Sequence, residues 1–179
     1  MNLKSNIKKW KISKFVVNKR YNFSRSKILK YLPKRMVDKA NNRIAKWNGY
    51  KKTPLIKLNK LSKELQLGEI FYKDESKRFR LKSFKALGGA YAVEVAARGN
   101  KNIVVSSATA GNHGRSVAWG AKRLGLKCKI FISQYVSAER ADTIKTLNAE
   151  VIRIKGNYKN SLEECKKQSK KNKWQIVQD

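Results

Sequence analysis

The chain has 179 residues, a length that is typical of one domain and sufficient to bury a hydrophobic core. Its 43 Lys and Arg residues outnumber 12 Asp and Glu residues, and the formal net charge of +31 excludes an acidic protein. Two cysteines and one histidine are too few for a disulfide scaffold or a Cys/His zinc site, so no metal is expected. The sequence has neither an apolar run of membrane-spanning length nor a secretory leader. These features predict a cytoplasmic protein with no membrane partner.

The first third of the chain is its most basic part. Residues 1–52 hold 17 Lys and Arg residues and one acidic residue, Asp38, and we interpret residues 1–49 as a basic N-terminal segment. The helical pattern there is weak, and its best apolar cluster lies at residues 28–32. Aromatic residues such as Trp10 interleave with the charges, as in a nucleic-acid-binding arm. No nucleic-acid motif is present, and Lys outnumbers Arg by 32 to 11 in the whole chain, so a general Lys-rich composition is favoured and no nucleic-acid partner is expected.

The folded core is expected to begin near residue 50. Pro54 follows a turn-like stretch and opens a short apolar run, so residues 50–56 are interpreted as the entry to the core. Residues 61–67 have a helical pattern that Gly68 is suited to stop. The next apolar run, residues 70–72, has the length and composition of a short strand.

From residue 102 onward, predicted strands and helices alternate. Apolar runs predict strands over residues 103–107, 128–132, 149–154 and 174–177. Helical spacing predicts helices over residues 114–124, 137–147 and 161–171, with Gly125 ending the first and Ser137 capping the second. This alternation predicts an α/β fold of three layers, with a parallel sheet between helices. Such sheets bind ligands beyond the C-terminal ends of their strands, which directs attention to the loop at residues 108–113.

The last predicted strand lies directly before Asp179, and no helix follows it. An α/β domain ordinarily covers its outer strand, because a bare edge invites pairing with other chains. We therefore expect the polypeptide to be incomplete.

Two segments contain residues that helices and strands alone do not explain. In the first, Phe84 and Lys85 precede an expected helix start in which Gly88 and Gly89 permit close packing. The second, residues 109–114, is expected at a strand-to-helix junction whose backbone N–H groups can bind an anion. Neither is a nucleotide-binding fingerprint. Spacing alone leaves both open, since one of 32 lysines is more often a solvated side chain and the second segment equally fits a structural Asx turn.

These segments resemble the fold type II pyridoxal-phosphate enzymes, whose fold is of the tryptophan synthase β type. The resemblance rests on Lys73-Asp74-Glu75-Ser76, on residues 83–93 with Ser83-Phe84-Lys85, and on residues 107–119 with Thr109-Ala110-Gly111-Asn112-His113-Gly114. Within that group the chain is most similar to the diaminopropionate ammonia-lyases, which residues 137–140, 156–158 and 174–179 also fit. The resemblance runs in order from about Tyr50 to Asp179, and residues 50–179 are interpreted as the N-terminal part of such an enzyme domain.

The resemblance implies a role for each matched residue. Lys85 would form a Schiff base with the aldehyde of pyridoxal phosphate, because burial makes a lysine amine nucleophilic. Phe84 would pack near the cofactor, and Asn112 would hydrogen-bond the hydroxyl of its ring. The substrate carboxylate would be received by a loop that contains Thr109, Ala110, Gly111 and His113, with His113 as a loop residue rather than a general base.

The implied activity is the α,β-elimination of ammonia from 2,3-diaminopropionate, which gives pyruvate and ammonia. Lys85 would take the Cα proton while the cofactor serves as an electron sink. The partner would be a small amino-acid substrate, and the full-length enzyme would be a homodimer. One alternative is a threonine or serine dehydratase, with whose motifs Leu87 and Gly114-Arg115 disagree. The other is a basic nucleic-acid-binding protein derived from an enzyme fragment.

Three departures from the family pattern affect these expectations. Ala110 stands where the family has Asp, and alanine cannot move a proton, so the stereospecificity is left open. Arg80 stands where Gly is usual, which predicts backbone strain if that position requires a positive φ. The family's Gly-rich phosphate loop belongs to a part that these 179 residues do not match, so we expect this chain alone to be inactive.

The remaining notable side chains are expected to be structural. Cys128 lies in a predicted strand and is interpreted as a small buried hydrophobe, whereas Cys165 on a polar helix is interpreted as incidental. Trp119 is expected in core packing. Asp74 and Glu75 are expected to pair with Lys77 or Arg78.

Overall fold

The computed structural model describes residues 24–178. The chain divides after Asp38, and the residues from Lys39 onward form one compact unit. Helix α2 (Arg25–Tyr31) begins after Ser24, whose side chain accepts a hydrogen bond from the Lys27 amide. Helix α3 (Lys34–Ile44) follows it. The apolar cluster predicted at residues 28–32 is exposed on α2, and Trp10 lies outside the described residues.

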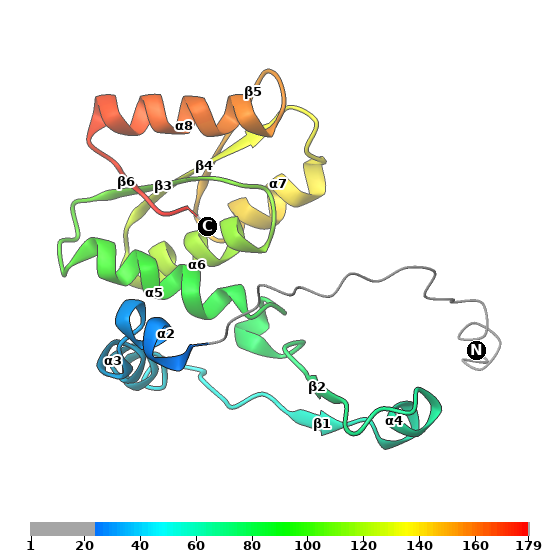
Figure 1. Ribbon diagram of the computed structural model, residues 1–179. Coiled ribbons are helices and arrows are strands. Elements are labelled where there is room, and N and C mark those ends of the chain that lie inside the picture. The colour runs from blue at the N-terminus through cyan, green and yellow to red at the C-terminus, as the bar shows by residue number, and fades with distance from the viewer. Residues whose placement is uncertain (1–23, 179) are drawn as a thin grey trace. The chain divides into compact units, whose positions relative to one another are not determined.

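Four parallel strands form the central sheet of the described chain, in the order β5-β4-β3-β6. They are β3 (Val104–Ala108), β4 (Lys127–Ser133), β5 (Glu150–Ile154) and β6 (Gln175–Ile176). All four lie within one residue of their predicted ends. In Figure 1, α8 (Tyr158–Asn172) covers one face of the sheet, and α6 (Asn112–Leu124) and α7 (Ala138–Lys145) cover the other. The predicted three-layer α/β fold is therefore confirmed.

Capping residues set the ends of these helices. The Ser137 hydroxyl accepts a hydrogen bond from the Arg140 amide at 3.4 Å, which confirms it as the cap of α7. Gly125 ends α6 with a φ of 68°, as predicted. Helix α8 begins three residues earlier than predicted, because the Asn157 side chain caps it and the Asn160 side chain accepts a hydrogen bond from the Asn157 amide in return.

The side chains of β4 alternate between the two layers of the core. Cys128, Ile130 and Ile132 pack in the larger cluster with residues of α5 (Lys85–Ala97) and α6. Phe131 points to the other face and packs with Ala108 and Cys165 beneath α8. Cys128 is a buried hydrophobe as predicted, and burial raises the pKa of its thiol to about 12. The interpretation of Cys165 as incidental was wrong, because its side chain is fully buried in this second cluster.

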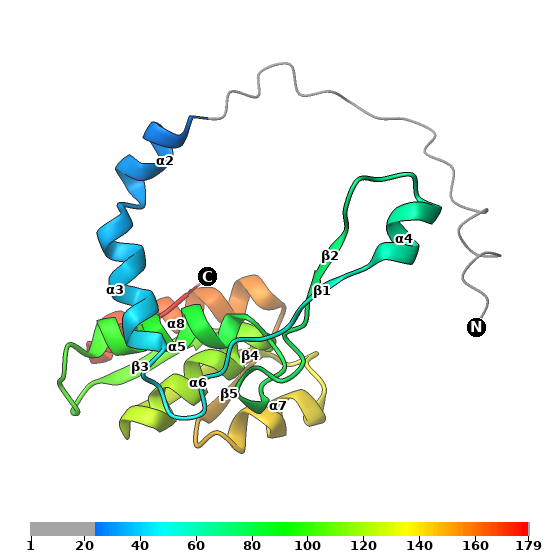
Figure 2. The same ribbon diagram turned by 90° about the horizontal axis from the view of Figure 1, so that it is seen from below.

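A small hairpin precedes the α/β layers in the chain. Strand β1 (Leu55–Lys57) pairs antiparallel with β2 (Phe71–Lys73), and α4 (Asn59–Glu64) lies between them. Figure 2 shows the two strands side by side, leading away from the sheet. The predicted strand at residues 70–72 is present one residue later. The helix predicted at residues 61–67 was misplaced: it starts earlier and ends before Gln66, whose φ is 53°. The interpretation of residues 50–56 as an entry segment missed β1.

Helices α5 and α6 approach so closely that glycine is needed at their contact. A Cβ atom at Gly120 would lie 2.7 Å from the Cα of Ala90, and one at Gly89 would lie 1.9 Å from the Oγ of Ser116. Ala90 and Ser116 are themselves fully buried. The two helices run in the same direction, since Ala97 and Leu124 at their last turns line one depression.

Gly120→Ala is expected to lower the free energy of unfolding by about 1–3 kcal/mol, because the added methyl group overpacks against the Ala90 backbone. Gly88→Ala is the matched control on α5, because its Cβ would meet no atom within 4 Å. Higher helix propensity should instead stabilise that variant by up to about 1 kcal/mol. Urea denaturation measures both changes. Equal stability of the two variants would contradict the close approach.

Candidate functional site

Lys85 lies at the edge of an open depression of about 290 Å³. Helix α5 begins at this residue, and the backbone amide of Lys85 donates a hydrogen bond to the Ser83 hydroxyl at 3.2 Å. Two further predicted residues, Phe84 and His113, line the same depression, together with Gly88, Gly89, Ala92 and Gln178. Phe84 is 65% exposed although it is a large aromatic side chain. The depression is therefore lined by the Lys85 amine, by the exposed ring of Phe84 and by two glycines.

Two side chains tie the end of the described chain to this depression. The Nε2 atom of His113 donates to the carbonyl oxygen of Val177 at 3.1 Å, because a carbonyl oxygen can only accept. Gln178 pairs with Ala108 like a backbone amide: its Oε1 accepts from the Ala108 amide at 3.0 Å and its Nε2 donates to the Ala108 carbonyl at 3.1 Å. His113 belongs to the first turn of α6, so its interpretation as a loop residue was wrong. Sequence reasoning missed Gln178.

The other predicted residues lie on the loop between β3 and α6. Thr109 follows β3, and its hydroxyl accepts from the Gly111 amide at 3.4 Å. Ala110, Gly111 and Asn112 line a second depression of about 280 Å³, which shares no lining residue with the depression at Lys85. Asn112 is the first residue of α6, and its Oδ1 accepts from Arg115 at 3.4 Å. The described structure thus brings Lys85, Phe84 and His113 together, and it groups Ala110, Gly111 and Asn112 separately.

The motif before Lys85 contains strained backbone. Phe79, Arg80 and Lys82 have φ values of 46°, 60° and 56°, in the left-handed region that disfavours residues with a Cβ. Arg80 was predicted to be strained if its position needs a positive φ, and the structure confirms that conformation.

Arg80→Gly is expected to raise the free energy of unfolding by about 1 kcal/mol, because glycine adopts this conformation without a steric cost. Arg80→Ala is the control, since it removes the same guanidinium but keeps a Cβ. Thermal unfolding of the two variants separates backbone strain from the loss of the side chain. Equal shifts in both variants would show that the strain has no energetic effect.

Glu75, which is half-buried, and the buried Arg78 form an ion pair that fastens this motif to residues 51–53. The Nε of Arg78 donates to Glu75 at 2.7 Å, and its two terminal nitrogens donate to the Lys51 carbonyl and the Thr53 hydroxyl. The hydrogen bond from Arg78, assisted by one from Thr53, lowers the pKa of Glu75 from 4.5 to about 2. The structural role predicted for Glu75 is confirmed. Asp74 is structural too, since its Oδ1 accepts from the Ser76 amide at 2.9 Å.

Because its pKa is lowered in the folded state, Glu75 stabilises the fold fully above pH 4.5 and loses this contribution as the pH falls toward 2. Glu75→Gln is expected to cost on the order of 2 kcal/mol at pH 7 and to flatten the loss of stability below pH 4.5. Asp142→Asn is the control, because Asp142 and its partner Lys145 are 63% and 58% exposed. Urea denaturation from pH 7 to pH 3 tests this, and parallel curves for both variants would refute it.

An aromatic cluster lies behind this motif. Trp119 on α6 packs against Phe79, with ring centroids 4.6 Å apart, and against Trp47 at 5.9 Å. The predicted packing role of Trp119 is confirmed. Trp47 is 4% exposed and belongs to the compact unit, while the predicted boundary between residues 49 and 50 stays a prediction.

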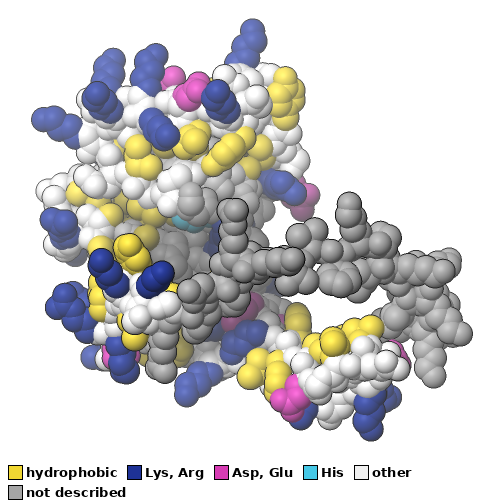
Figure 3. Space-filling model, viewed as in Figure 1, with side chains coloured by type: hydrophobic (Ala, Val, Ile, Leu, Met, Phe, Trp, Pro, Cys, Tyr) yellow, Lys and Arg dark blue, Asp and Glu magenta, His cyan; other side chains and the backbone are white. Residues whose placement is uncertain are grey.

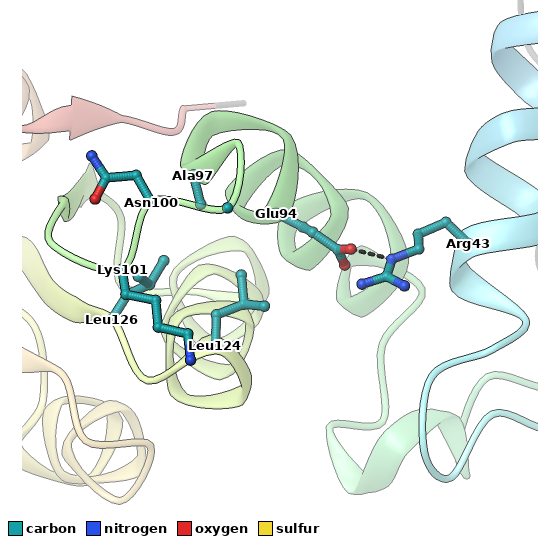
Figure 4. Close-up of a pocket in the computed structure, with 8 residues that line it drawn as sticks. Arg43, Glu94, Ala97, Asn100, Lys101, Leu124 and Leu126 are labelled. Atoms are coloured by element: carbon teal, nitrogen blue, oxygen red, sulfur yellow. Dashed lines mark hydrogen bonds and ion pairs between the residues drawn. The ribbon is translucent and has the colours of Figure 1, made fainter.

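A further depression of about 260 Å³ lies at the opposite ends of α5 and α6. In Figure 4, Arg43 of α3 reaches Glu94 of α5 and forms an ion pair with it. The other oxygen of Glu94 accepts from the indole nitrogen of Trp47 at 3.1 Å. Glu94 therefore anchors residues 43–47 on α5. We interpret this depression as part of that structural contact, because it lies at the ends of α5 and α6 that are opposite to Lys85 and Asn112.

On the face shown in Figure 3, Lys and Arg side chains are scattered over several elements rather than gathered in one patch. Within residues 24–178, no helix is long and apolar enough to cross a membrane. In the same residues, no group of three or more His, Cys, Asp or Glu side chains could hold a metal ion.

Comparison with known proteins identifies the class to which this fold and these motifs belong. Residues 46–179 match the sequence model of the family described as "Pyridoxal-phosphate dependent enzyme". The chain therefore belongs to the pyridoxal-phosphate-dependent enzyme family.

Individual relatives give a narrower similarity. The chain is 33% identical to the diaminopropionate ammonia-lyase of Escherichia coli (strain K12), over 90% of this chain and 44% of that protein. The crystal structure of holo diaminopropionate ammonia-lyase from Escherichia coli matches with a TM-score of 0.82 and 32% identity, over 92% of this chain and 46% of that one. The biosynthetic L-threonine dehydratase of Haemophilus influenzae is 37% identical over 59% of this chain and 20% of that protein. The chain thus spans less than half the length of each of these relatives.

These alignments also correct the expected extent of the resemblance, which was placed from about Tyr50 onward. An alignment over 90% of the chain leaves out only about a tenth of it, so it reaches well into residues 1–49. Part of the basic segment is therefore similar to the relatives' own sequence, which favours a segment of the enzyme over an added nucleic-acid-binding arm.

The cofactor of this family is pyridoxal phosphate, and the depression at Lys85 fits two parts of it. A lysine amine suits the aldehyde, and the exposed Phe84 ring together with the open floor at Gly88 suits a flat aromatic ring. Among the residues that line this depression, Lys85 is the only Lys or Arg, so no second basic side chain of that kind is present there for the phosphate.

Proposed function

We propose that this chain carries the cofactor-binding lysine of an ammonia-lyase that converts 2,3-diaminopropionate to pyruvate and ammonia. The observation that carries the proposal is the position of Lys85, at the first turn of α5 and beside a depression shared with Phe84 and His113. Similarity to the diaminopropionate ammonia-lyase of Escherichia coli over 90% of the chain supports this substrate. The chain spans 44% of that relative, and we propose the complete reaction for a larger protein or assembly that is a homodimer.

Each residue of the proposed site has its own task. Lys85 would hold the cofactor and, as a neutral amine, take the Cα proton of the substrate. Pyridoxal phosphate, when bound, supplies an electron sink that acidifies this proton. Phe84 would pack on the cofactor ring, and Asn112 would hydrogen-bond the ring hydroxyl. Backbone N–H groups of Thr109, Ala110, Gly111 and His113 would bind the substrate carboxylate.

Borohydride reduction in the presence of pyridoxal phosphate is expected to label Lys85 well above the surface lysines, because the depression receives the aromatic ring as well as the aldehyde. Peptide mapping by mass spectrometry measures the label on each lysine. Lys85→Ala should abolish the preferential label. Lys127→Ala, at the opposite end of β4, should leave it unchanged. Uniform labelling of all lysines would contradict the assignment of Lys85 as the cofactor-binding lysine.

The same experiment separates the two candidate substrates. A substrate amine would compete with the Lys85 amine for the aldehyde, so it should protect Lys85 from reduction more than it protects surface lysines. Stronger protection by diaminopropionate than by threonine supports the proposed substrate. The reverse order favours a dehydratase, as the similarity to the threonine dehydratase suggests.

A further inference from the structure

The side chain of Gln178 takes the place of a backbone hydrogen-bonding partner at the end of β3. One residue earlier, the backbone still makes this contact, because the Val177 amide donates to the Ser106 carbonyl at 2.9 Å. At Ala108 the Gln178 side chain accepts from the backbone amide at 3.0 Å and donates to the carbonyl at 3.1 Å. Ala108 is fully buried, and the loop at residues 109–111 follows it directly. On this side of the strand, a single side chain therefore fixes the residue from which the loop starts.

Two further hydrogen bonds fix the orientation of the Gln178 amide. Its Oε1 also accepts from the Ser107 hydroxyl at 3.3 Å, and its Nε2 also donates to the Tyr158 hydroxyl at 3.1 Å. A side-chain amide has two donor hydrogens and two acceptor lone pairs, so all of its hydrogen-bonding positions are used. Turning the amide over would bring its NH₂ group against the Ala108 amide. Because Tyr158 is the first residue of α8, the same amide joins the end of β3 to the start of that helix.

Gln178 also links the loop to the depression at Lys85, which it lines. Two consecutive residues hold the two sides of the loop: Gln178 holds Ala108 before it, and the Val177 carbonyl accepts from His113 after it. The middle of the loop lines the other depression. The position of its backbone N–H groups relative to the Lys85 amine therefore depends on this short segment, and Gln178 is the member of the segment that acts through its side chain.

We propose that Gln178 is a positioning residue for the substrate carboxylate. It holds residues 109–111 where their backbone N–H groups meet the carboxylate of an amino acid whose amine has reached the cofactor at Lys85. Hydrogen bonds weaken steeply when donor and acceptor are displaced or misaligned, so a loop released at Ala108 binds the carboxylate poorly. This inference rests on the proposed function and deepens it, because it assigns the preference for amines with a carboxylate to a side chain whose own hydrogen bonds all go to the protein.

The test compares two amines that differ only in the carboxylate, with the full 179-residue chain and pyridoxal phosphate. Diaminopropionate carries the carboxylate, and 1,2-diaminoethane is the same diamine without it. Each is titrated as a protector of Lys85 against borohydride reduction. Gln178→Met keeps the length of the side chain and removes its amide. It should raise the concentration of diaminopropionate that gives half protection about tenfold, as expected for the loss of a hydrogen bond to a charged group. The concentration of 1,2-diaminoethane that gives half protection should stay unchanged.

Gln168→Met is the matched control, because it makes the same substitution at a half-buried glutamine whose amide donates within α8, to Glu164 at 2.8 Å. It should leave both half-protecting concentrations unchanged. An equal rise for both amines in Gln178→Met would show general damage to the depression at Lys85. No rise for either amine would show that the loop does not need the amide. Both results would overturn the positioning role.

Amide hydrogen exchange tests the same contact without the cofactor and separates this inference from the proposed function. Exchange of the Ala108 amide, followed by NMR, should be about tenfold faster in Gln178→Met than in the unsubstituted chain or in Gln168→Met, because the amide loses its acceptor. If borohydride labels all lysines of the unsubstituted chain uniformly, the proposed function fails, and the exchange rate of Ala108 alone decides whether Gln178 holds the loop. Equal exchange rates in all three proteins would overturn the inference whatever the labelling shows.

Discussion

The close approach of α5 and α6 is the constraint on which the rest of the structure depends. Gly89 against Ser116 and Gly120 against Ala90 leave no room for a Cβ, so the spacing of the helix backbones is fixed. The helices run in the same direction, and their first residues are Lys85 and Asn112. A packing requirement in the middle of two helices therefore sets the positions of the two motifs at their ends, at the edge where parallel strands meet ligands.

The end of the described chain completes this arrangement. Strand β6 pairs with β3 over only two residues, but Gln178 continues the pairing through its side chain on Ala108. His113 binds the Val177 carbonyl from the other side. The loop at Thr109, Ala110 and Gly111 thus leaves a strand and enters a helix that are both fastened to the same short segment. Such anchoring of a binding loop by a rigid scaffold is what positions polar groups for a ligand.

Local patterns in the sequence predict much of this fold, because its strands are apolar runs and its helices carry recognisable caps. Ser137 and Gly125 are signals that depend only on neighbouring residues. The predictions fail for residues whose contacts in the fold come from distant parts of the sequence. Cys165 lies on a polar helix, and only the position of α8 over Phe131 buries it. Strand β1 exists because β2 pairs with it. The sequence analysis assigned all the motif residues to one site, whereas in the structure they line two depressions on either side of the first turn of α6. The spacing of residues along the chain does not predict this division.

The division of that loop has a chemical consequence. On the side of α5, an amine, an aromatic ring and glycines suit a flat carbonyl compound. On the side of α7, Arg115 and Arg140 line the depression, and Ala110 supplies no carboxylate there. A carboxylate at residue 110 would lie in the depression that Arg115 and Arg140 also line, and it would offset part of their positive charge. With alanine there, the residues that line this depression include two arginines and no acidic side chain. The side chain at residue 110 therefore sets the charge balance of the loop that, in the proposed function, would receive the substrate carboxylate.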